Sequence, residues 1–328
     1  MSGLPGPLRL LPVFLTKPWA APSLPGPLGR ILQAPPHTGE VWLASDRHQV
    51  TPIAGGPLDG LGLDQALVRW PEHLLGPGRQ GPFPLLIKLL NVGQWLSVQV
   101  HPDDQAARRL ENEPWGKSEA WHILAAEPGA QMIHGLASGA DREGLRRALD
   151  QGRLPELLAK VSVKTGETYL VPAGVVHAPG PGLLMFEVQQ ASDVTYRFYD
   201  WDRLGQDGRP RPLHQDKALA VMQATGPGRP RPPQQLSGPP LEQVLLAQET
   251  HFRLLRCHLR ASAPLPAAQG PRLLFVLEGK ARLSWRGSEG PAELASGQSW
   301  LLPAGLGPAG LQADAEGIIY LESLASGG

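Results

Sequence analysis

Short apolar or alternating runs, separated by glycine and proline, follow one another along most of the chain. This pattern predicts many short β-strands joined by turns. The chain has 39 glycines and 36 prolines, and they lie between the runs instead of forming one low-complexity tract. The predicted strands include residues 40–45, 84–92, 95–101, 119–125, 167–173, 183–190, 194–201, 272–279, 281–287, 299–305 and 317–324.

Helical spacing of apolar residues is confined to the middle of the chain. It occurs in "DDQAARRLEN", in "ADREGLRRALDQG" and in "LPELLAKV". Acidic residues begin the first two segments, as is favourable near a helix N-terminus. We therefore expect a small helical insertion over about 102–160, between strands.

One segment occurs twice. "GETYLVPAGVVHAP" at 166–179 aligns without a gap with "GQSWLLPAGLGPAG" at 297–310. Each copy reads as strand, turn and strand, and each follows another pair of predicted strands. The repeat predicts two related antiparallel barrels or sandwiches. The copies differ at one informative position, where His177 of the first corresponds to Pro308 of the second.

The stretch 224–240 is rich in proline and glycine and reads as a linker or long connection. It divides the chain into a first part, 1–223, and a second part, 241–328. A second part of this size is a small β-domain. A length of 328 residues is sufficient for two domains of ordinary size.

Composition narrows the class of protein. With 41% hydrophobic residues and 30 basic against 30 acidic side chains, the chain is typical of a soluble globular protein. It has no general attraction for nucleic acid or anionic membranes. We see no signal-peptide pattern and no apolar span of roughly 18 residues, so we expect a cytoplasmic protein. The single cysteine, Cys257, excludes an internal disulfide and a cysteine-based zinc site.

Three predicted strands each carry a polar face. Successive side chains of a strand point to opposite sides, so alternate polar residues share a side. The faces of a buried strand usually carry valine or leucine, so we expect these polar faces to line a solvent-filled site. The three faces consist of Ser97, Gln99 and His101; of Lys117, Glu119 and Trp121; and of Asp193, Thr195, Arg197 and Tyr199.

His101, Glu119 and His177, with Gln99 as a possible fourth donor, form a set that suits zinc or another borderline divalent cation. A single strand histidine is more often a hydrogen-bonded structural residue than a ligand. The turn before His177 strengthens the metal hypothesis, because Pro172 and Gly174 define a tight connection that projects the imidazole at a set distance.

Residues 166–177 resemble the second signature of cupin barrels, and "QVH" at 99–101 resembles a variant of the first. More narrowly, the chain resembles the shorter bacterial form of the type I mannose-6-phosphate isomerases over about 12–221. The resemblance implies two cupin-type, jelly-roll-like barrels, the first of them catalytic. It is carried by "LSVQVHPDD", "GKSEAWHIL", "VPAGVVHAPGPG", "FEVQQASDVTYRFYDWDR" and "RPLHQDKAL" in that order.

The resemblance also implies roles for individual residues. The family interconverts an aldose phosphate and a ketose phosphate, mannose 6-phosphate and fructose 6-phosphate, through an enediol, with one zinc ion per chain. It implies zinc ligands at His101, Glu119, His177 and Gln99; catalytic roles for Arg197, Lys117, Glu187 and Asp193; and substrate or phosphate contacts from Ser97, Lys117 and Arg203. The proton-transferring base stays open among Glu187, Asp193 and Lys117.

Two other functions fit parts of the pattern. Two histidines and a carboxylate could serve a non-haem iron oxygenase, although Gln99 and the nearby cations argue against it. A sugar-phosphate-binding protein without turnover is the second alternative. Pro308 in place of a ligand predicts that the second barrel holds no metal. We expect a monomer or homodimer with a small-molecule partner, and no nucleic-acid or membrane partner.

Overall fold

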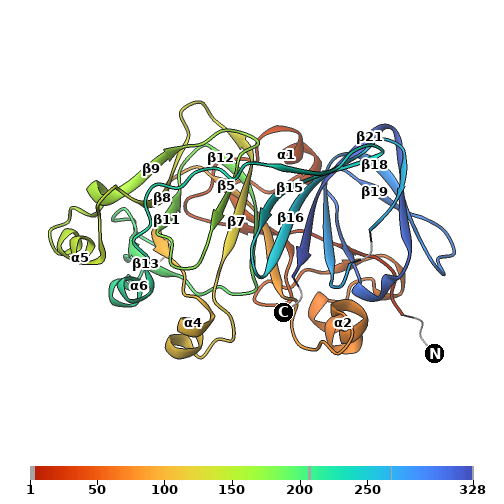
Figure 1. Cartoon of the computed structure of the whole chain (residues 1–328), viewed down its shortest axis with the longest axis horizontal. Helices are drawn as coiled ribbons and strands as arrows, with labels where there is room; N and C mark the ends of the chain where they lie inside the picture. Colours follow the sequence, from red (N-terminus) through yellow and green to blue (C-terminus); the bar gives the residue numbers. More distant parts are fainter. Residues whose placement is uncertain (1–3, 206–207, 267, 327–328) are drawn as a thin grey trace.

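The computed structural model describes residues 4–205, 208–266 and 268–326. Strands dominate it and form three antiparallel sheets (Figure 1). The prediction of a mainly β fold is therefore confirmed. In the view of Figure 1 the five-stranded sheet lies on the left, the six-stranded sheet in the middle, and the largest sheet on the right.

Two sheets from the first part of the chain face each other. Their facing sides bury an apolar cluster that includes Trp121 and Met185 from one sheet and Met132 from the other. In order, the six-stranded sheet contains β10 (Thr168–Val171), β7 (Glu119–Ala126), β12 (Leu183–Gln190), β5 (Leu85–Val92), β3 (Thr38–Ala44) and β2 (Val13–Thr16), and the five-stranded sheet contains β13 (Tyr196–Tyr199), β6 (Val98–Val100), β11 (His177–Pro179), β8 (Gln131–Leu136) and β9 (Leu158–Ser162).

The third sheet has ten strands. Two predicted strands, 272–279 and 281–287, are one continuous strand, because Gly279 adopts a φ of 86° and the chain passes it with a shift of register instead of a turn. In order, this sheet contains β14 (Gln234–Ser237), β15 (Leu241–Gln248), β16 (Phe252–Leu259), β21 (Ala309–Ala325), β18 (Arg272–Trp285), β20 (Ser299–Leu302), β1 (Leu8–Leu10) and β4 (Ile53–Ala54), with β17 (Ser262–Pro264) beside β21 and β19 (Ala292–Ala295) beside β18.

The two parts of the chain share this third sheet. Leu8 of β1 pairs with Leu301 of β20, and β4 pairs with the other side of β1. The expected linker 224–240 contains β14, which pairs with β15. The domain boundaries at 223 and 241 stay a prediction. Residues 1–54 contribute two strands, β1 and β4, to the ten-stranded sheet.

Helices are short, and the expectation that they are confined to the middle is wrong. Three of them precede residue 76, where short segments bounded by proline and glycine carry too few turns to show a helical period. The segment 154–161 begins as a 3-10 turn, η2 (Leu154–Leu157), and continues as β9; β7 and β8 also interrupt the expected helical insertion. The helices are α1 (Gly26–Leu32), α2 (Leu63–Arg69), α3 (Pro71–Leu75), α4 (Asp104–Glu111), α5 (Arg142–Asp150) and α6 (Gln215–Val221), and the other 3-10 turns are η1 (Gly56–Leu58) and η3 (Ala304–Leu306).

None of the helices that the structure describes has the length and apolar character needed to cross a bilayer.

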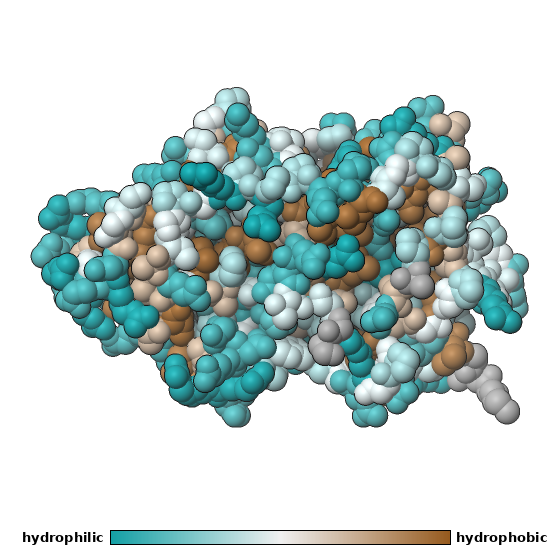
Figure 2. Space-filling view, viewed as in Figure 1, coloured by the Kyte–Doolittle hydropathy of each residue, from teal (hydrophilic) through white to brown (hydrophobic). Residues whose placement is uncertain are grey.

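The largest apolar cluster lies between the six-stranded and ten-stranded sheets, where Phe186 of β12 stacks on Phe275 of β18 with ring centroids 5.9 Å apart. Figure 2 shows a mostly hydrophilic face with apolar residues exposed towards its middle.

Cys257 is fully buried, and burial raises the pKa of its thiol well above the usual value, so the thiol stays protonated.

The repeated turn is built alike in its first half and differently in its second. In both copies the proline carbonyl accepts a hydrogen bond from the backbone N–H of the third residue after it. Val175 donates to Pro172, and Leu306 donates to Pro303, each over 3.1 Å. Gly174 then takes a φ of 88°, whereas the second copy continues as η3. His177 is consequently fully buried and Pro308 is exposed.

Candidate active site

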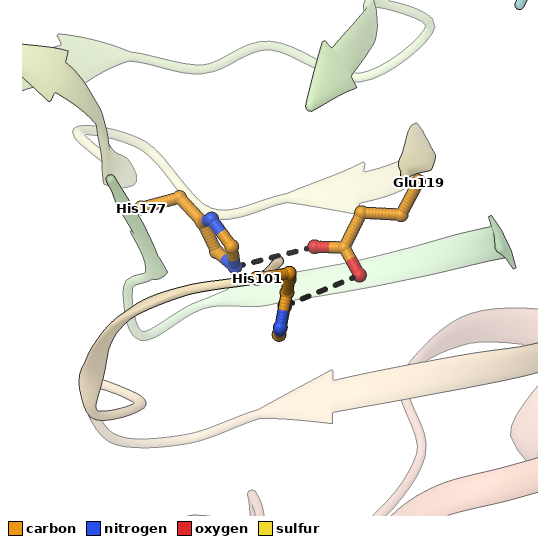
Figure 3. A group of neighbouring side chains, drawn as sticks. All are labelled: His101, Glu119 and His177. Atoms are coloured by element: carbon orange, nitrogen blue, oxygen red, sulfur yellow. Dashed lines mark ion pairs between the residues drawn. The ribbon is translucent and has the colours of Figure 1, made fainter. Parts of the chain in front are cut away.

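The predicted metal ligands come together between the two facing sheets. Glu119 begins β7 of the six-stranded sheet, while His177 begins β11 and His101 directly follows β6 of the five-stranded sheet. One ligand atom from each lies within 4.8 Å of the others, and all three residues are buried. Figure 3 shows both imidazoles turned towards the Glu119 carboxylate, with Nε2 of His177 3.3 Å and Nε2 of His101 3.7 Å from its oxygens.

Both histidines are held as neutral imidazoles. His101 Nδ1 lies 2.8 Å from the Val194 carbonyl oxygen and His177 Nδ1 lies 2.9 Å from that of Val175. A carbonyl only accepts, so each Nδ1 carries the hydrogen and each Nε2 presents its lone pair to the cluster. Burial lowers the pKa of both imidazoles, that of His177 to about 3, which keeps them uncharged at neutral pH.

The Glu119 carboxylate fits a cation. It is 1% exposed, and neither of its oxygens has a hydrogen-bond partner among the described residues. The Lys117 ammonium lies 3.2 Å from one oxygen and 3.3 Å from His101 Nε2. A buried carboxylate without hydrogen bonds is costly unless positive charge compensates it. Two imidazole nitrogens and a carboxylate are a donor set that zinc accepts.

Gln99 reaches the same cluster. Its Nε2 lies 3.2 Å from His177 Nε2, and the Ser97 hydroxyl donates to its Oε1 over 3.3 Å. An amide oxygen and nitrogen can exchange places by a half rotation of the group, so Gln99 can offer either atom to the cluster. The structure thus places Ser97, Gln99 and His177 in one chain of contacts.

A cavity of about 190 Å³ opens beside the cluster. Glu119 connects the two, because its carboxylate contacts both histidines and the residue also lines the cavity. Trp121 packs edge-on against His177 and lines the cavity as well; its buried indole N–H has no partner among the described residues. The other predicted site residues on the wall are Ser97, Gln99, Lys117, Glu187, Asp193 and Arg197.

Two arginines bind the Asp200 carboxylate, and one of them lines the cavity. Arg203 is not among the residues that line this cavity; its guanidinium donates to Asp200 over 2.8 Å. Arg211 shares that carboxylate through two bonds of 2.6 Å and does line the cavity. Arg211 is the first residue of the "RPLHQDKAL" motif, three residues before His214, and this position gave no signal of a site role. The role of Arg203 stays a prediction.

Sequence reasoning also missed Lys88. It lies on β5, is 5% exposed and approaches Glu187 Oε2 to 3.3 Å on the cavity wall. Burial lowers the pKa of Lys88, but the neighbouring Glu187 and Glu40 raise it by more, so the amine stays charged. The sequence indicates this residue by a single lysine inside the apolar run "PLLIKLLNV". An unpaired lysine is almost never fully buried, so a lysine in a buried strand points to a charged partner.

Glu187 has the most strongly perturbed carboxyl on this wall. Burial raises its pKa to about 7, Lys88 opposes that shift, and the nearby Glu119 charge adds to it. On the neighbouring strands, Glu187 pairs with Lys88 of β5 and with Trp121 of β7. A carboxyl of this kind is typical of a functional site.

His122 and His134 are buried histidines outside the cluster, and each has a hydrogen-bond partner. His134 Nε2 lies 3.0 Å from the Leu170 carbonyl oxygen, and His122 Nδ1 lies 2.9 Å from the Thr168 hydroxyl. His122 is 5% exposed, and its side chain points to the face of β7 opposite Glu119 and Trp121.

The buried His122 predicts a loss of stability in acid. Burial, with a smaller contribution from Arg256, lowers its pKa from 6.5 to about 4. Between these values the unfolded chain binds a proton that the folded protein excludes, so the free energy of unfolding falls as pH drops from 6.5 to 4, by about 3 kcal/mol at most from this residue. Urea unfolding over this range should show a shallower decline in His122→Gln than in wild type at equal metal content. Identical slopes would contradict the assignment.

Comparisons with known proteins show the family to which the chain is similar. Residues 21–119 match the family model described as phosphomannose isomerase type I, catalytic domain. A probable mannose-6-phosphate isomerase of Bacillus subtilis, GmuF, is 34% identical over 304 residues, which cover 92% of this chain and 94% of the relative. A mannose-6-phosphate isomerase of Streptococcus mutans is 36% identical over 248 residues, 75% and 77% of the two chains.

A solved structure extends the agreement to the fold. The crystal structure of the mannose 6-phosphate isomerase from Bacillus subtilis superposes with a TM-score of 0.84 at 28% identity, and the match covers 97% of this chain and 99% of the other. The similarity therefore includes the ten-stranded sheet, for which sequence motifs indicated only a general barrel. With relatives above 30% identity over nearly its whole length, this chain belongs to the type I phosphomannose isomerases.

Proposed function

We propose that this protein interconverts mannose 6-phosphate and fructose 6-phosphate with one zinc ion held by His101, Glu119 and His177, and with Gln99 as a fourth donor. The observation that carries the proposal is the buried Glu119 carboxylate, which has no hydrogen-bond partner among the described residues and lies between two neutral imidazoles at the wall of a cation-lined cavity. The names of the curated relatives supply the substrates.

The reaction moves one proton between neighbouring carbons. A proton leaves C2 of the aldose, an enediol forms, and a proton is added at C1 to give the ketose. When bound, zinc supplies positive charge beside the oxygens of the enediolate. The other tasks fall to side chains, which must bind the phosphate, orient the sugar and carry the proton.

Arginines at one side of the cavity suit the phosphate. Arg197 and Arg211 both line it, and Asp200 orients the Arg211 guanidinium with two hydrogen bonds. A guanidinium fork binds phosphate oxygens in pairs and stays charged at any physiological pH. Ser97 and Lys117 complete the proposed contacts on the wall, and Arg203 would act on the phosphate through its charge.

Three groups are placed to carry the proton, namely Lys117, Glu187 and Asp193, all of which line the cavity. We propose that the base is one of them. A cytoplasmic location and a monomeric or homodimeric state complete the proposal, as expected for an enzyme of sugar phosphates.

Incubation of the protein with mannose 6-phosphate in heavy water tests the proposed reaction. We expect fructose 6-phosphate to form and solvent deuterium to appear at C2 or C1, because the transferred proton exchanges with solvent while the enediol exists. Nuclear magnetic resonance of the sugar phosphates reports both. Oxygen uptake would instead indicate an oxygenase, and binding without exchange would indicate a sugar-phosphate sensor; either result contradicts the proposal.

A further inference from the structure

Gln190, the last residue of β12, has a buried side chain whose amide oxygen and amide nitrogen both form hydrogen bonds. It is 3% exposed. Its Oε1 accepts the backbone N–H of Ser118 over 2.9 Å, and its Nε2 donates to Asp104 Oδ1 over 2.9 Å. The backbone N–H of Gln190 also donates to the Ser118 carbonyl, so the two residues are joined twice. Gln190 lines neither the proposed cavity nor the metal cluster.

The partners of Gln190 belong to the segments that carry the three proposed metal ligands. Ser118 directly precedes Glu119, and its hydroxyl accepts the Ala173 N–H over 3.2 Å in the turn that leads to His177. Asp104 begins α4, three residues after His101. One amide therefore connects the Glu119 strand directly to the segment after His101, and through Ser118 to the turn before His177.

Further backbone bonds make this connection rigid. The Gly174 N–H donates to the His101 carbonyl and the Lys117 N–H to the Pro102 carbonyl, each over 2.9 Å. Asp104 Oδ1 accepts a second bond, of 2.8 Å, from the Gly116 N–H. The ligands thus come from segments that are bonded to one another away from the ligand atoms, and outer-shell partners of this kind hold ligands in place.

We propose that Gln190 is a positioning residue for the metal cluster, one that holds the His101, Glu119 and His177 segments in register for zinc. The inference rests on the proposed metal site. Only an amide supplies the acceptor that Ser118 needs and the donor that Asp104 needs; a carboxylate at this position would face the Asp104 carboxylate.

The test is the zinc affinity of the variant Gln190→Met, measured on folded protein by competition with a zinc-binding dye. Methionine keeps the length of the side chain but supplies neither bond. We expect zinc to bind about 10- to 100-fold more weakly than in wild type. The double variant Gln190→Glu with Asp104→Asn restores one acceptor and one donor between the two side chains, but the introduced amide group that donates to the introduced carboxylate cannot accept the Gly116 N–H. We therefore expect it to bind zinc more tightly than Gln190→Met and more weakly than wild type.

Gln298→Met is the matched control. Gln298 lies in the second copy of the repeated segment, where its Oε1 accepts the Ala295 N–H over 3.1 Å, and none of the proposed ligands is near it in the chain. Its zinc affinity should equal that of wild type. Wild-type affinity in folded Gln190→Met would overturn the inference alone, whereas a wild-type protein that binds no zinc would overturn the proposed metal site as well.

Discussion

The variant His177→Ala is expected to lose bound metal and isomerase activity together. His177 is fully buried, its Nδ1 is held by the Val175 carbonyl, and its Nε2 lies 3.3 Å from Glu119. Alanine removes one of two imidazole donors and leaves no other side chain at that point of β11. Zinc should fall below one tenth of an equivalent after dialysis, measured by atomic emission. Because a metal ion supplies several kcal/mol to a transition state of this kind, we expect kcat to fall by about a thousandfold or more.

Pro308→Ala is the matched control, because Pro308 occupies the equivalent position of the second copy. It is exposed, and only its carbonyl is bonded, to the Arg286 N–H over 3.1 Å. Its metal content and kcat should equal those of wild type. Full activity in metal-free His177→Ala would show that the cluster is not the site of the reaction.

The second large effect is expected from Arg197→Lys. Arg197 lines the cavity from β13, and its buried Nε has no hydrogen-bond partner among the described residues. Lysine keeps the charge but loses the planar fork that binds two oxygens at once. We expect kcat/KM for mannose 6-phosphate to fall by about 10²- to 10³-fold, as when one aimed donor is removed from an enzyme site. Steady-state kinetics measure this, and zinc content should not change.

Arg146→Lys on α5 is the matched control. Its guanidinium is exposed and contacts only the exposed Asp216, at 3.6 Å. Its kinetics should equal those of wild type. If Arg197→Lys retained wild-type kcat/KM, the proposal that Arg197 binds the phosphate would be wrong.

The fold could be predicted from sequence where the pattern is long and regular. The alternation before His101 matches the strand period, and the segment of β12, which begins with four apolar residues after Gly182, is typical of a buried strand. Helices of five to seven residues, such as α3, carry too little periodicity to be seen. The pairing of β1 with β20 could not be predicted, because a three-residue strand gives no indication of its partner.

The candidate site divides in a similar way. His101, Glu119 and His177 could be predicted to come together because the resemblance to the family implies that they share a metal ion, and strand alternation adds which neighbours share a face with His101 and Glu119. Lys88 could have been found, since its charge interrupts an apolar run. Arg211 could not be distinguished from Arg203 by sequence, because both bind Asp200 and only the path of the chain decides which one faces the cavity.

The place of β1 in the ten-stranded sheet has a consequence for how the chain folds during synthesis. Leu8 is made long before its partner Leu301. Until Leu301 is made, one edge of β1 lacks its hydrogen bonds, and the apolar cluster between the two largest sheets lacks Leu301 and Leu321. Contacts this distant in sequence make folding slow, so the fold should not be completed until β20 and β21 have left the ribosome.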